Sequence, residues 1–332
     1  MGNKTYNALV VEEIGEKTFT RSIKEKCVDD LPAGDLLIRV CYSSLNYKDA
    51  LSASGNKGVT RVFPHTPGID ASGIVEESDN DQFKPGDPVI VTSYDLGMNT
   101  PGGFGGYIRV PAAWAVKLPP GMTLKESMIL GTAGFTAGMS VYKLIQHVSP
   151  DQGPILVTGA TGGVGSIALS ILSHLGYRVT GVTGKPEGGD FLALLGADRT
   201  ISRETFTKGS ERPILKAQWA GVIDTVGGTI LAAAIKGTSP LGVVTCCGNV
   251  ASPDLPITVF PFILRGVSLV GIDSQNCPMN FRKKVWKKLA GEWRFKHPDG
   301  FHREITLKAL DHHIERILKG ELKGRTIVHL DQ

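Results

Sequence analysis

The stretch Ile155-Leu-Val-Thr-Gly-Ala-Thr-Gly-Gly-Val-Gly165-Ser-Ile-Ala-Leu169 carries the strongest structural signal in this chain. A short apolar run enters a turn dense in glycine, and a helix-compatible segment follows. Such a turn lets backbone N–H groups approach a pyrophosphate, whose charge the helix N-terminus stabilises. Against the pattern G-x-G-x-x-G, Gly162 and Gly165 fill the second and third places, while Ala160 occupies the first with Gly159 beside it. The alternative of an ordinary tight turn is disfavoured by the strand and helix on either side.

Strand and helix patterns alternate after this loop. Strands are expected at Ile155–Thr158, Arg178–Val182, Arg199–Ser202, Gly221–Val226, Gly242–Cys246 and Val267–Ile272, with helices at Ser166–Leu175 and Asp190–Leu195. Alternation at this spacing predicts βαβ units and an α/β fold with a doubly wound parallel sheet.

The rest of the chain has a different character. Short strands are expected at Ala8–Glu12, Asp35–Tyr42, Gly73–Glu77 and Pro88–Thr92, which suggests a β-rich, barrel-like domain. A helical stretch, Ser127–Gln146, follows Pro119-Pro120-Gly121. The last segment predicts helices at Phe281–Trp293 and Leu307–Lys319 and a strand at Arg325–Leu330, and we expect it to fold back onto the first domain.

Composition narrows the class of protein. With 332 residues, about two domains are expected. The charge balance, 36 − 32 = +4, is too mild to indicate a nucleic-acid binder. Glycine is abundant, 41 of 332 residues, as in a turn-rich α/β enzyme.

Five cysteines without a C-x-x-C pair fit neither a disulfide framework nor a structural zinc site. The N-terminus contains no signal-peptide core, and no apolar run is long enough to span a membrane. We therefore expect a cytoplasmic, soluble protein without nucleic-acid or membrane partners.

The end of the second strand indicates which nucleotide the loop holds. An NAD-specific site places Asp or Glu there, to bind the ribose 2′-hydroxyl. Here the strand ends Gly181-Val-Thr-Gly-Lys185, without an acid, and Arg199 begins the third strand, which we expect close to the same corner. Two cations without a carboxylate favour the 2′-phosphate of NADP(H), although Lys185 could also be a solvated loop lysine.

With these motifs in view, the chain resembles the medium-chain dehydrogenase/reductase superfamily over nearly its whole length. The landmarks are Gly131-Thr-Ala-Gly-Phe-Thr-Ala137, Gly159–Gly165, Asp224-Thr-Val-Gly-Gly228 and Gly324-Arg-Thr-Ile-Val328. More closely, it is similar to the YhdH/YhfP-type quinone oxidoreductases, some of which are NADPH-dependent acrylyl-CoA reductases. The motifs for that similarity are Ser43-Ser-Leu-Asn-Tyr-Lys-Asp49, Pro67-Gly-Ile-Asp70, Phe260-Pro-Phe-Ile-Leu-Arg265 and Gly271-Ile-Asp-Ser274.

The resemblance implies a GroES-like catalytic domain made from both chain ends, 1–122 and 274–332, around a Rossmann NADP-binding domain, 123–273. It also implies a homodimer formed through the Rossmann sheet edge, where Val267–Ile272 would lie. The cofactor-binding residues that it implies are Tyr47, Thr136, Thr161, Gly162, Gly163, Val164, Thr183, Gly184, Lys185, Arg199, Asn249, Ile263 and Ser274.

Zinc-dependent members of the superfamily place Cys and His-Glu ligands in the first domain. Here Ile69 and Asp70 stand where His and Glu would be, and Cys41 has no histidine near it in a ligand motif. We therefore expect no metal. Without zinc to polarise an alcohol or carbonyl, hydride delivery to an already activated acceptor is the feasible chemistry: a quinone, a conjugated enone or an enoyl thioester.

Asn46 and Tyr47 are the candidate catalytic residues, because an amide N–H and a phenol can stabilise or protonate the enolate formed. Alternatively, Tyr47 only packs on the nicotinamide and Asp49 only caps the next helix. Lysines at Lys283, Lys284, Lys287 and Lys288 could meet the phosphates of a CoA thioester, or form a solvated helix face. Two rival functions stay open: a nucleotide-binding sensor without turnover, and a zinc alcohol dehydrogenase.

Overall fold

The computed structural model describes residues 4–330, and the chain falls into two compact units. Unit 1 holds Met1–Thr132, Gln275–Lys284 and Gly300–Gln332, and unit 2 holds Ala133–Ser274 and Val285–Asp299. The domain ranges expected from the sequence stay a prediction, since compact units reflect packing density and do not test which segments fold independently.

Unit 2 is built on a six-stranded sheet of order β10-β9-β8-β11-β12-β13, in which all neighbouring strands are parallel. Its strands are β8 (Ile155–Val157), β9 (Val179–Thr183), β10 (Arg199–Ser202), β11 (Trp219–Asp224), β12 (Thr238–Cys246) and β13 (Ser268–Gly271). The doubly wound fold class is confirmed. The strand order reverses between β8 and β11, where sheets of this kind bind ligands at the carboxyl ends of the strands.

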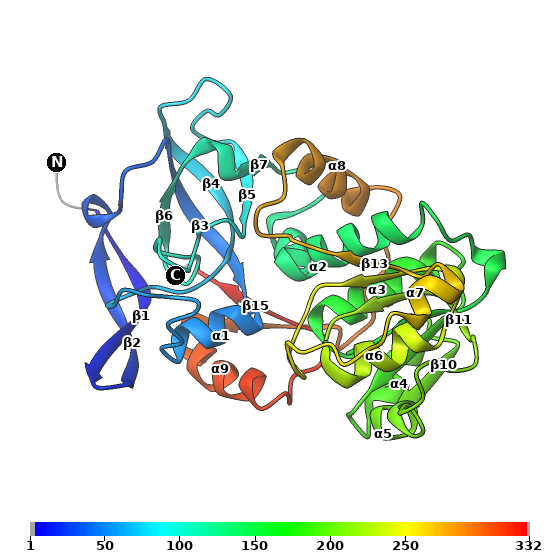
Figure 1. The fold of residues 1–332 in the computed structure, drawn as a ribbon. Helices are drawn as coiled ribbons and strands as arrows, with labels where there is room; N and C mark the ends of the chain where they lie inside the picture. Colours follow the sequence, from blue (N-terminus) through cyan, green and yellow to red (C-terminus); the bar gives the residue numbers. More distant parts are fainter. Residues whose placement is uncertain (1–3, 331–332) are drawn as a thin grey trace. The chain divides into compact units, whose positions relative to one another are not determined.

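The helices of unit 2 lie between these strands in the chain, and Figure 1 shows them alongside the sheet. They are α3 (Gly163–His174), α4 (Gly188–Leu194), α5 (Arg203–Thr207), α6 (Gly228–Lys236) and α7 (Phe260–Arg265). Apolar residues of three adjacent strands, Leu156, Val222 and Val244, pack with Leu231 and Ile235 of α6. Continuous apolar runs suit parallel strands, because both faces of such a sheet are covered by helices.

Unit 1 is the β-rich unit. A hairpin of β1 (Thr5–Gly15) and β2 (Thr18–Cys27) accompanies a seven-stranded sheet of order β14-β15-β3-β4-β5-β7, in which β6 also pairs with β3. The strands are β3 (Leu36–Ser44), β4 (Asp70–Ser78), β5 (Pro88–Thr92), β6 (Tyr107–Val110), β7 (Ala115–Lys117), β14 (His302–Thr306) and β15 (Arg325–His329).

The C-terminal segment returns to the N-terminal sheet, as expected. Strand β15 pairs antiparallel with β3, and Figure 1 shows the red strand beside the blue one. Helices α1 (Tyr47–Ala53) and α9 (Leu310–Leu318) contribute to one apolar cluster, in which Ala50 meets Leu310 and Ile314. Residues far apart in the sequence therefore complete one core.

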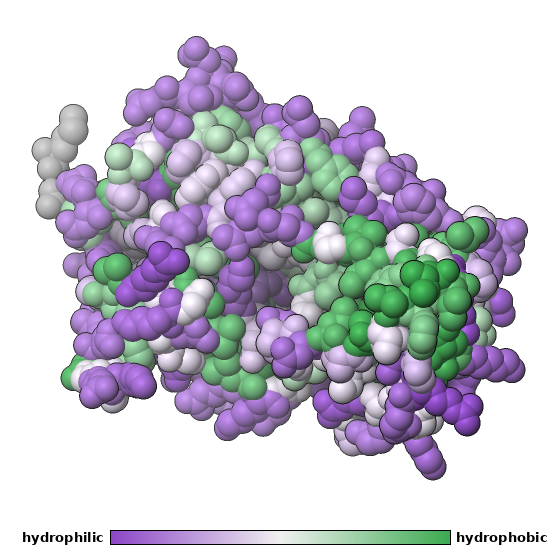
Figure 2. All heavy atoms as spheres, in the orientation of Figure 1, coloured by the Kyte–Doolittle hydropathy of each residue, from purple (hydrophilic) through white to green (hydrophobic). Residues whose placement is uncertain are grey.

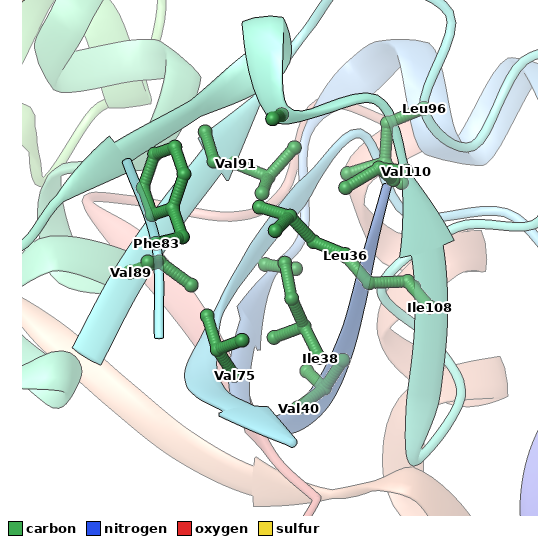
Figure 3. Packing of buried hydrophobic residues seen from close by; sticks show 13 residues of the cluster. Leu36, Ile38, Val40, Val75, Phe83, Val89, Val91, Leu96, Ile108 and Val110 are labelled. Carbon is green, nitrogen blue, oxygen red and sulfur yellow. The ribbon is translucent and has the colours of Figure 1, made fainter. Parts of the chain in front are cut away.

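Alternate residues of β3, β5 and β6 fill the interior of the main sheet (Figure 3). Leu36, Ile38 and Val40 of β3 point to the same side because side chains alternate along a strand. Each fully buried aliphatic side chain contributes about 1.5–3 kcal/mol relative to leaving it in water. This packing stabilises the sheet and so holds the ends of its strands, from which the loops start, in fixed positions.

Two helices run from one unit into the other: α2 (Leu124–Leu144) and α8 (Met279–Ala290). Helix α2 is broken at Gly131, whose φ of 54° and ψ of −154° are not helical. Single-turn 3-10 segments lie at Val28–Asp30, Ala112–Trp114, Pro150–Gln152 and Leu307–Ala309. The expected helix Leu307–Lys319 is thus a 3-10 turn followed by α9. No helix among residues 4–330 is both long and apolar enough to cross a membrane.

Candidate active site

The glycine-rich loop of unit 2 joins β8 to α3 at the point where the strand order reverses. Gly159 has a φ of 57°, and a Cβ at Gly165 would lie 2.4 Å from the carbonyl oxygen of Gly159. Helix α3 starts after Gly162 without a side-chain cap and without an acid in its first turn. Its N-terminal N–H groups and dipole therefore suit an anion, and the loop fits the pyrophosphate of a dinucleotide.

The loop is tied to the end of β9, where the second group of predicted residues lies. The hydroxyls of Thr161 and Thr183 are 3.1 Å apart, and the backbone N–H of Lys185 donates to the Thr183 hydroxyl at 3.1 Å. The structure therefore brings together Thr161, Gly162, Gly163, Val164, Thr183, Gly184 and Lys185, and no carboxylate ends β9.

Arg199 does not lie at this corner. It starts β10 and pairs with Thr180, whereas Ser202 pairs with Thr183 at the other end of the ladder. Because the strands are parallel, the residue after Ser202 is the one that reaches the corner. The guanidinium of that residue, Arg203, lies against Gly184: a Cβ at Gly184 would be 2.7 Å from its Nη2. Sequence reasoning chose Arg199, the first residue of β10. Because ligands bind at the carboxyl ends of parallel strands, Arg203, which follows the last residue of β10, is the better placed arginine.

The other predicted cofactor residues of unit 2 come from four different segments. Thr136 is buried in α2, Asn249 lies beside Gly227 after β12, and Ser274 lies beyond β13. Ile263 stands on α7 with 67% of its surface exposed. Their roles as cofactor contacts stay predictions.

In unit 1, Asn46 and Tyr47 form the start of helix α1. Asn46 is the N-cap and Tyr47 the first helical residue, and both are half-buried. The carboxylate of Asp49 accepts the Asn46 backbone N–H at 2.7 Å and the Ile69 backbone N–H at 2.7 Å. These two hydrogen bonds fix the first turn of α1 and join it to the loop before β4.

Asn46 has a fully engaged carboxamide. Its Nδ2 donates to the carboxylate of Asp70 at 2.7 Å, to that of Asp49 at 3.2 Å and to the Ser44 carbonyl at 3.3 Å. Its Oδ1 accepts from Nη1 of Arg325 at 3.2 Å. By contrast, the phenol of Tyr47 has no hydrogen-bond partner among the described residues. Of the two catalytic candidates, only Tyr47 therefore has its polar group uncommitted.

Asp70 lies at the centre of this cluster with 0% of its surface exposed. It accepts from the Ser44 hydroxyl at 2.5 Å, and from the backbone N–H and hydroxyl of Thr132 at 2.9 Å and 2.6 Å. Arg325, 3% exposed, places Nη2 3.9 Å from the same carboxylate. A Cβ at Gly131 would lie 2.5 Å from Oδ2 of Asp70, so the break in α2 makes room for the cluster.

Sequence reasoning did not name Arg325, Ser44 and Thr132 as members of the site, and it gave Asp49 only a capping role. All four lie within motifs quoted for the family resemblance: Ser44 and Asp49 in Ser43–Asp49, Thr132 in Gly131–Ala137, and Arg325 in Gly324–Val328. What the sequence could not show is that residues 49, 70 and 325 meet in the interior. The available signal was an acid, Asp49, three places after Asn46, which is the spacing of a capping box.

These groups do not fit a zinc ion. The lone pairs of Asp70 are directed at N–H and O–H donors and a guanidinium lies nearby, whereas zinc requires Cys, His or carboxylate ligands whose lone pairs face the metal. Within residues 4–330, no three His, Cys, Asp or Glu side chains are grouped to hold a metal ion.

Comparison with known proteins agrees with this architecture. Residues 32–120 match the alcohol dehydrogenase GroES-like domain, and residues 163–291 match the zinc-binding dehydrogenase family. The chain is 44% identical to Bacillus subtilis YhfP, a protein named provisionally as a quinone oxidoreductase. The match extends over 313 residues, which are 93% of this chain and 94% of YhfP. It is 41% identical over 328 residues, 98% and 99% of the two chains, to acrylyl-CoA reductase AcuI of Ruegeria pomeroyi.

Two solved structures are similar along the whole chain. The yhdH oxidoreductase of Salmonella enterica, in complex with NADP, has a TM-score of 0.93 at 39% identity, covering 98% of this chain and 100% of that one. Bacillus subtilis yhfP, with NAD bound, has a TM-score of 0.94 at 42% identity and the same coverage.

The fold and the nucleotide loop, together with these relatives, show that the chain belongs to the medium-chain dehydrogenase/reductase family. Within that family it falls in the group that contains YhfP, YhdH and AcuI.

Asp49 gives the unit 1 cluster a titration near neutral pH. Burial, followed by the charge of Asp70, raises the pKa of Asp49 from 3.8 to about 7. Between these values the folded chain holds a proton that the unfolded chain has lost, so this group's contribution to stability falls as pH rises toward 7.

We expect the free energy of unfolding of the native protein to fall relative to that of Asp49→Asn as the pH rises from about 5 to about 8. The fall is up to about 1.4 kcal/mol per pH unit. Asp70 and Arg325, the charged groups facing Asp49, are the same in both proteins. Urea unfolding across this pH range measures the effect. A difference that does not change with pH would show that Asp49 titrates at its ordinary value.

Proposed function

We propose that this protein is an NADPH-dependent reductase that delivers hydride to a quinone or to a double bond conjugated with a carbonyl group. The observation that carries the proposal is the glycine loop at the strand-order reversal, with an uncapped helix N-terminus and a β9 end that has cations and no carboxylate. The relatives support it, because YhfP is provisionally a quinone oxidoreductase and AcuI is an acrylyl-CoA reductase.

Bound NADPH would supply the hydride, and the remaining tasks fall to the protein. The N-terminus of α3 neutralises pyrophosphate charge, and Lys185 with Arg203 would hold the 2′-phosphate. After hydride addition, negative charge develops on the acceptor oxygen and a proton is needed there. Such an acceptor requires no Lewis acid, which agrees with the hydrogen-bonded state of Asp70.

Tyr47 is the proposed proton donor to that oxygen. Its hydroxyl is uncommitted and its ring is half-buried at the first position of α1, which Asp49 caps. Asn46 was predicted as a second donor. Because its amide hydrogens face two carboxylates and a carbonyl, we propose that it holds the start of α1 in place.

The central test follows NADPH absorbance with three acceptors: a benzoquinone, acrylyl-CoA and a truncated enoyl thioester. We expect turnover with at least one acceptor, and a loss of about a hundredfold or more in kcat for Tyr47→Phe, which keeps the ring and removes the donor. A protein that binds NADPH and turns over none of the acceptors is a nucleotide-binding sensor. Full turnover by Tyr47→Phe excludes Tyr47 as the donor.

The same assay decides between the two acceptor classes. If CoA thioesters are the substrates, binding energy from the distant phosphates assists catalysis, and acrylyl-CoA will have a much higher kcat/KM than the truncated thioester. High salt will then reduce that advantage by screening phosphate contacts. Equal kcat/KM values for both thioesters leave quinone and enone reduction as the function.

Cofactor preference is expected to depend on Arg203 more than on Arg199. A guanidinium at the corner can make charge-assisted hydrogen bonds to a 2′-phosphate, and losing them raises the KM for NADPH about tenfold in Arg203→Ala. The KM for NADH will stay unchanged. Arg199→Ala is the matched control, since Arg199 lies at the far end of β10. Equal effects of the two variants contradict this assignment. The KM for NADH is measured as well, because the similar yhfP structure has NAD bound.

We also propose a homodimer formed through the edge strand β13. Figure 2 shows apolar residues gathered over the region of α7. Leu241, Val259, Ile263 and Leu264 are each more than half exposed there, next to a strand that has a neighbour on one side only. A contiguous apolar surface of this kind marks an interface, and an open sheet edge can pair with its copy.

Light scattering or sedimentation is expected to give twice the mass of one chain for the native protein. Leu264→Asp places a charge in the apolar surface and will yield monomers. Leu194→Asp is the control, because Leu194 of α4 is as exposed, 67% against 66%, and lies outside this surface. A monomeric native protein, or equal dissociation by both variants, contradicts the proposed interface.

A cytoplasmic location is proposed as well, since Cys27, Cys246 and Cys247 carry thiols suited to a reducing compartment.

A further inference from the structure

Unit 2 buries one carboxylate, Asp224, without an ion-pair partner among the described residues. Asp224 is the last residue of β11, next to β8 at the strand-order reversal, and is 0% exposed. Burial raises its pKa, while hydrogen bonds from Thr158 and the backbone lower it. A buried charge is costly unless hydrogen bonds replace its hydration, so the donors around Asp224 must be held in fixed positions.

The two carboxylate oxygens of Asp224 hold two different loops. Oδ1 accepts from the hydroxyl of Thr158 at 2.6 Å, and Thr158 is the residue between β8 and Gly159. Oδ2 accepts from the backbone N–H groups of Gly227 at 2.8 Å and Val226 at 3.3 Å, in the turn between β11 and α6. One side chain thus sets the position of the glycine loop relative to the neighbouring turn.

Thr225 completes the connection. Its backbone N–H donates to the Thr158 hydroxyl at 3.1 Å, and its own hydroxyl donates to the Thr158 carbonyl at 2.9 Å. The glycine loop fits closely against this residue, since a Cβ at Gly159 would lie 2.4 Å from the Thr225 hydroxyl. The residues at the end of β11 therefore fix both the hydroxyl and the carbonyl of Thr158, the residue that leads into the phosphate loop.

We propose that Asp224, acting through Thr158 and Thr225, is a positioning residue for the phosphate-binding loop. The inference rests on the proposed function, because it concerns how the same loop binds NADPH. A carboxylate cannot itself contact pyrophosphate favourably, so its value lies in holding the N–H donors of the loop in their binding geometry before NADPH arrives. Such preorganisation lowers the entropy lost on binding and appears in the affinity.

The test compares two buried threonines of unit 2. Thr158→Val keeps the shape and removes the hydroxyl between Asp224 and Thr225. Thr245→Val is the control, because Thr245 of β12 is also 0% exposed, yet its hydroxyl donates only to the Val222 carbonyl at 3.4 Å. Fluorescence titration with NADPH is expected to give a Kd about tenfold higher for Thr158→Val, and a change below about twofold for Thr245→Val.

Further measurements separate positioning from general damage. In steady-state assays, Thr158→Val will raise the KM for NADPH and leave kcat at saturating NADPH close to native, because the chemistry lies elsewhere. Thr158→Ser restores the hydroxyl and will restore the native Kd. If Thr158→Val does not fold, Thr225→Val, which removes the opposite hydrogen bond, is expected to raise the Kd in the same way.

A native Kd in Thr158→Val, an equal rise in Thr245→Val, or failure of Thr158→Ser to restore binding would each overturn the inference. These outcomes leave the proposed function standing, since the native protein still binds NADPH and reduces its acceptor. Failure of the native protein to bind NADPH would instead remove the proposed function, and this inference with it.

Discussion

The carboxylate of Asp70 constrains how unit 1 is assembled. With 0% of its surface exposed, it requires donors on every side, and these come from the end of β3, the start of α1 and the segment after the break in α2. Arg325 of β15 adds a nearby positive charge from the C-terminal part of the chain. A buried anion with a missing donor is costly, so these segments are stable mainly when all of them are in place.

The start of α1 depends on this requirement. Asn46 lies between the two acids Asp49 and Asp70 with Arg325 on its carbonyl side, and Tyr47 follows it. The position of the Tyr47 ring is therefore set by hydrogen bonds that Tyr47 does not make. Gly131 matters for the same reason: its φ of 54° is readily adopted only by glycine, and the space a Cβ would fill is occupied by the Asp70 carboxylate and the Ser44 hydroxyl.

Unit 2 also depends on a buried carboxylate that is held by hydrogen bonds. Asp224 also lies buried at the end of a strand, but backbone N–H groups and a threonine surround it instead of an arginine. The acid in unit 1 fixes a helix start that carries a phenol, and the acid in unit 2 fixes a loop that carries N–H donors. In both units, a group that does not itself act on the ligand sets the geometry of the groups proposed to do so.

Periodicity and glycine placement were sufficient for the α/β class, for the parallel sheet and for the loop between Val157 and Gly163, because these depend on neighbours in the chain. The same reasoning found β5 and β10 with their observed bounds, Pro88–Thr92 and Arg199–Ser202. It missed β2, whose polar residues resemble a loop, and α1, whose seven residues show too little periodicity. Short or polar elements are stabilised by their partners, which local patterns do not include.

The candidate site divides along the same line. The sequence by itself determined that a dinucleotide loop is present, that no acid ends β9 and that Asn46 and Tyr47 stand together. Only the tertiary structure decided that Arg203 reaches the corner in place of Arg199, because strand register sets which end of β10 meets Thr183. It alone also decided that Asn46 is engaged and Tyr47 is not, since the partners Asp70 and Arg325 are 24 and 279 residues away along the chain. Side-chain hydrogen bonds over such separations exist only once the backbone is folded.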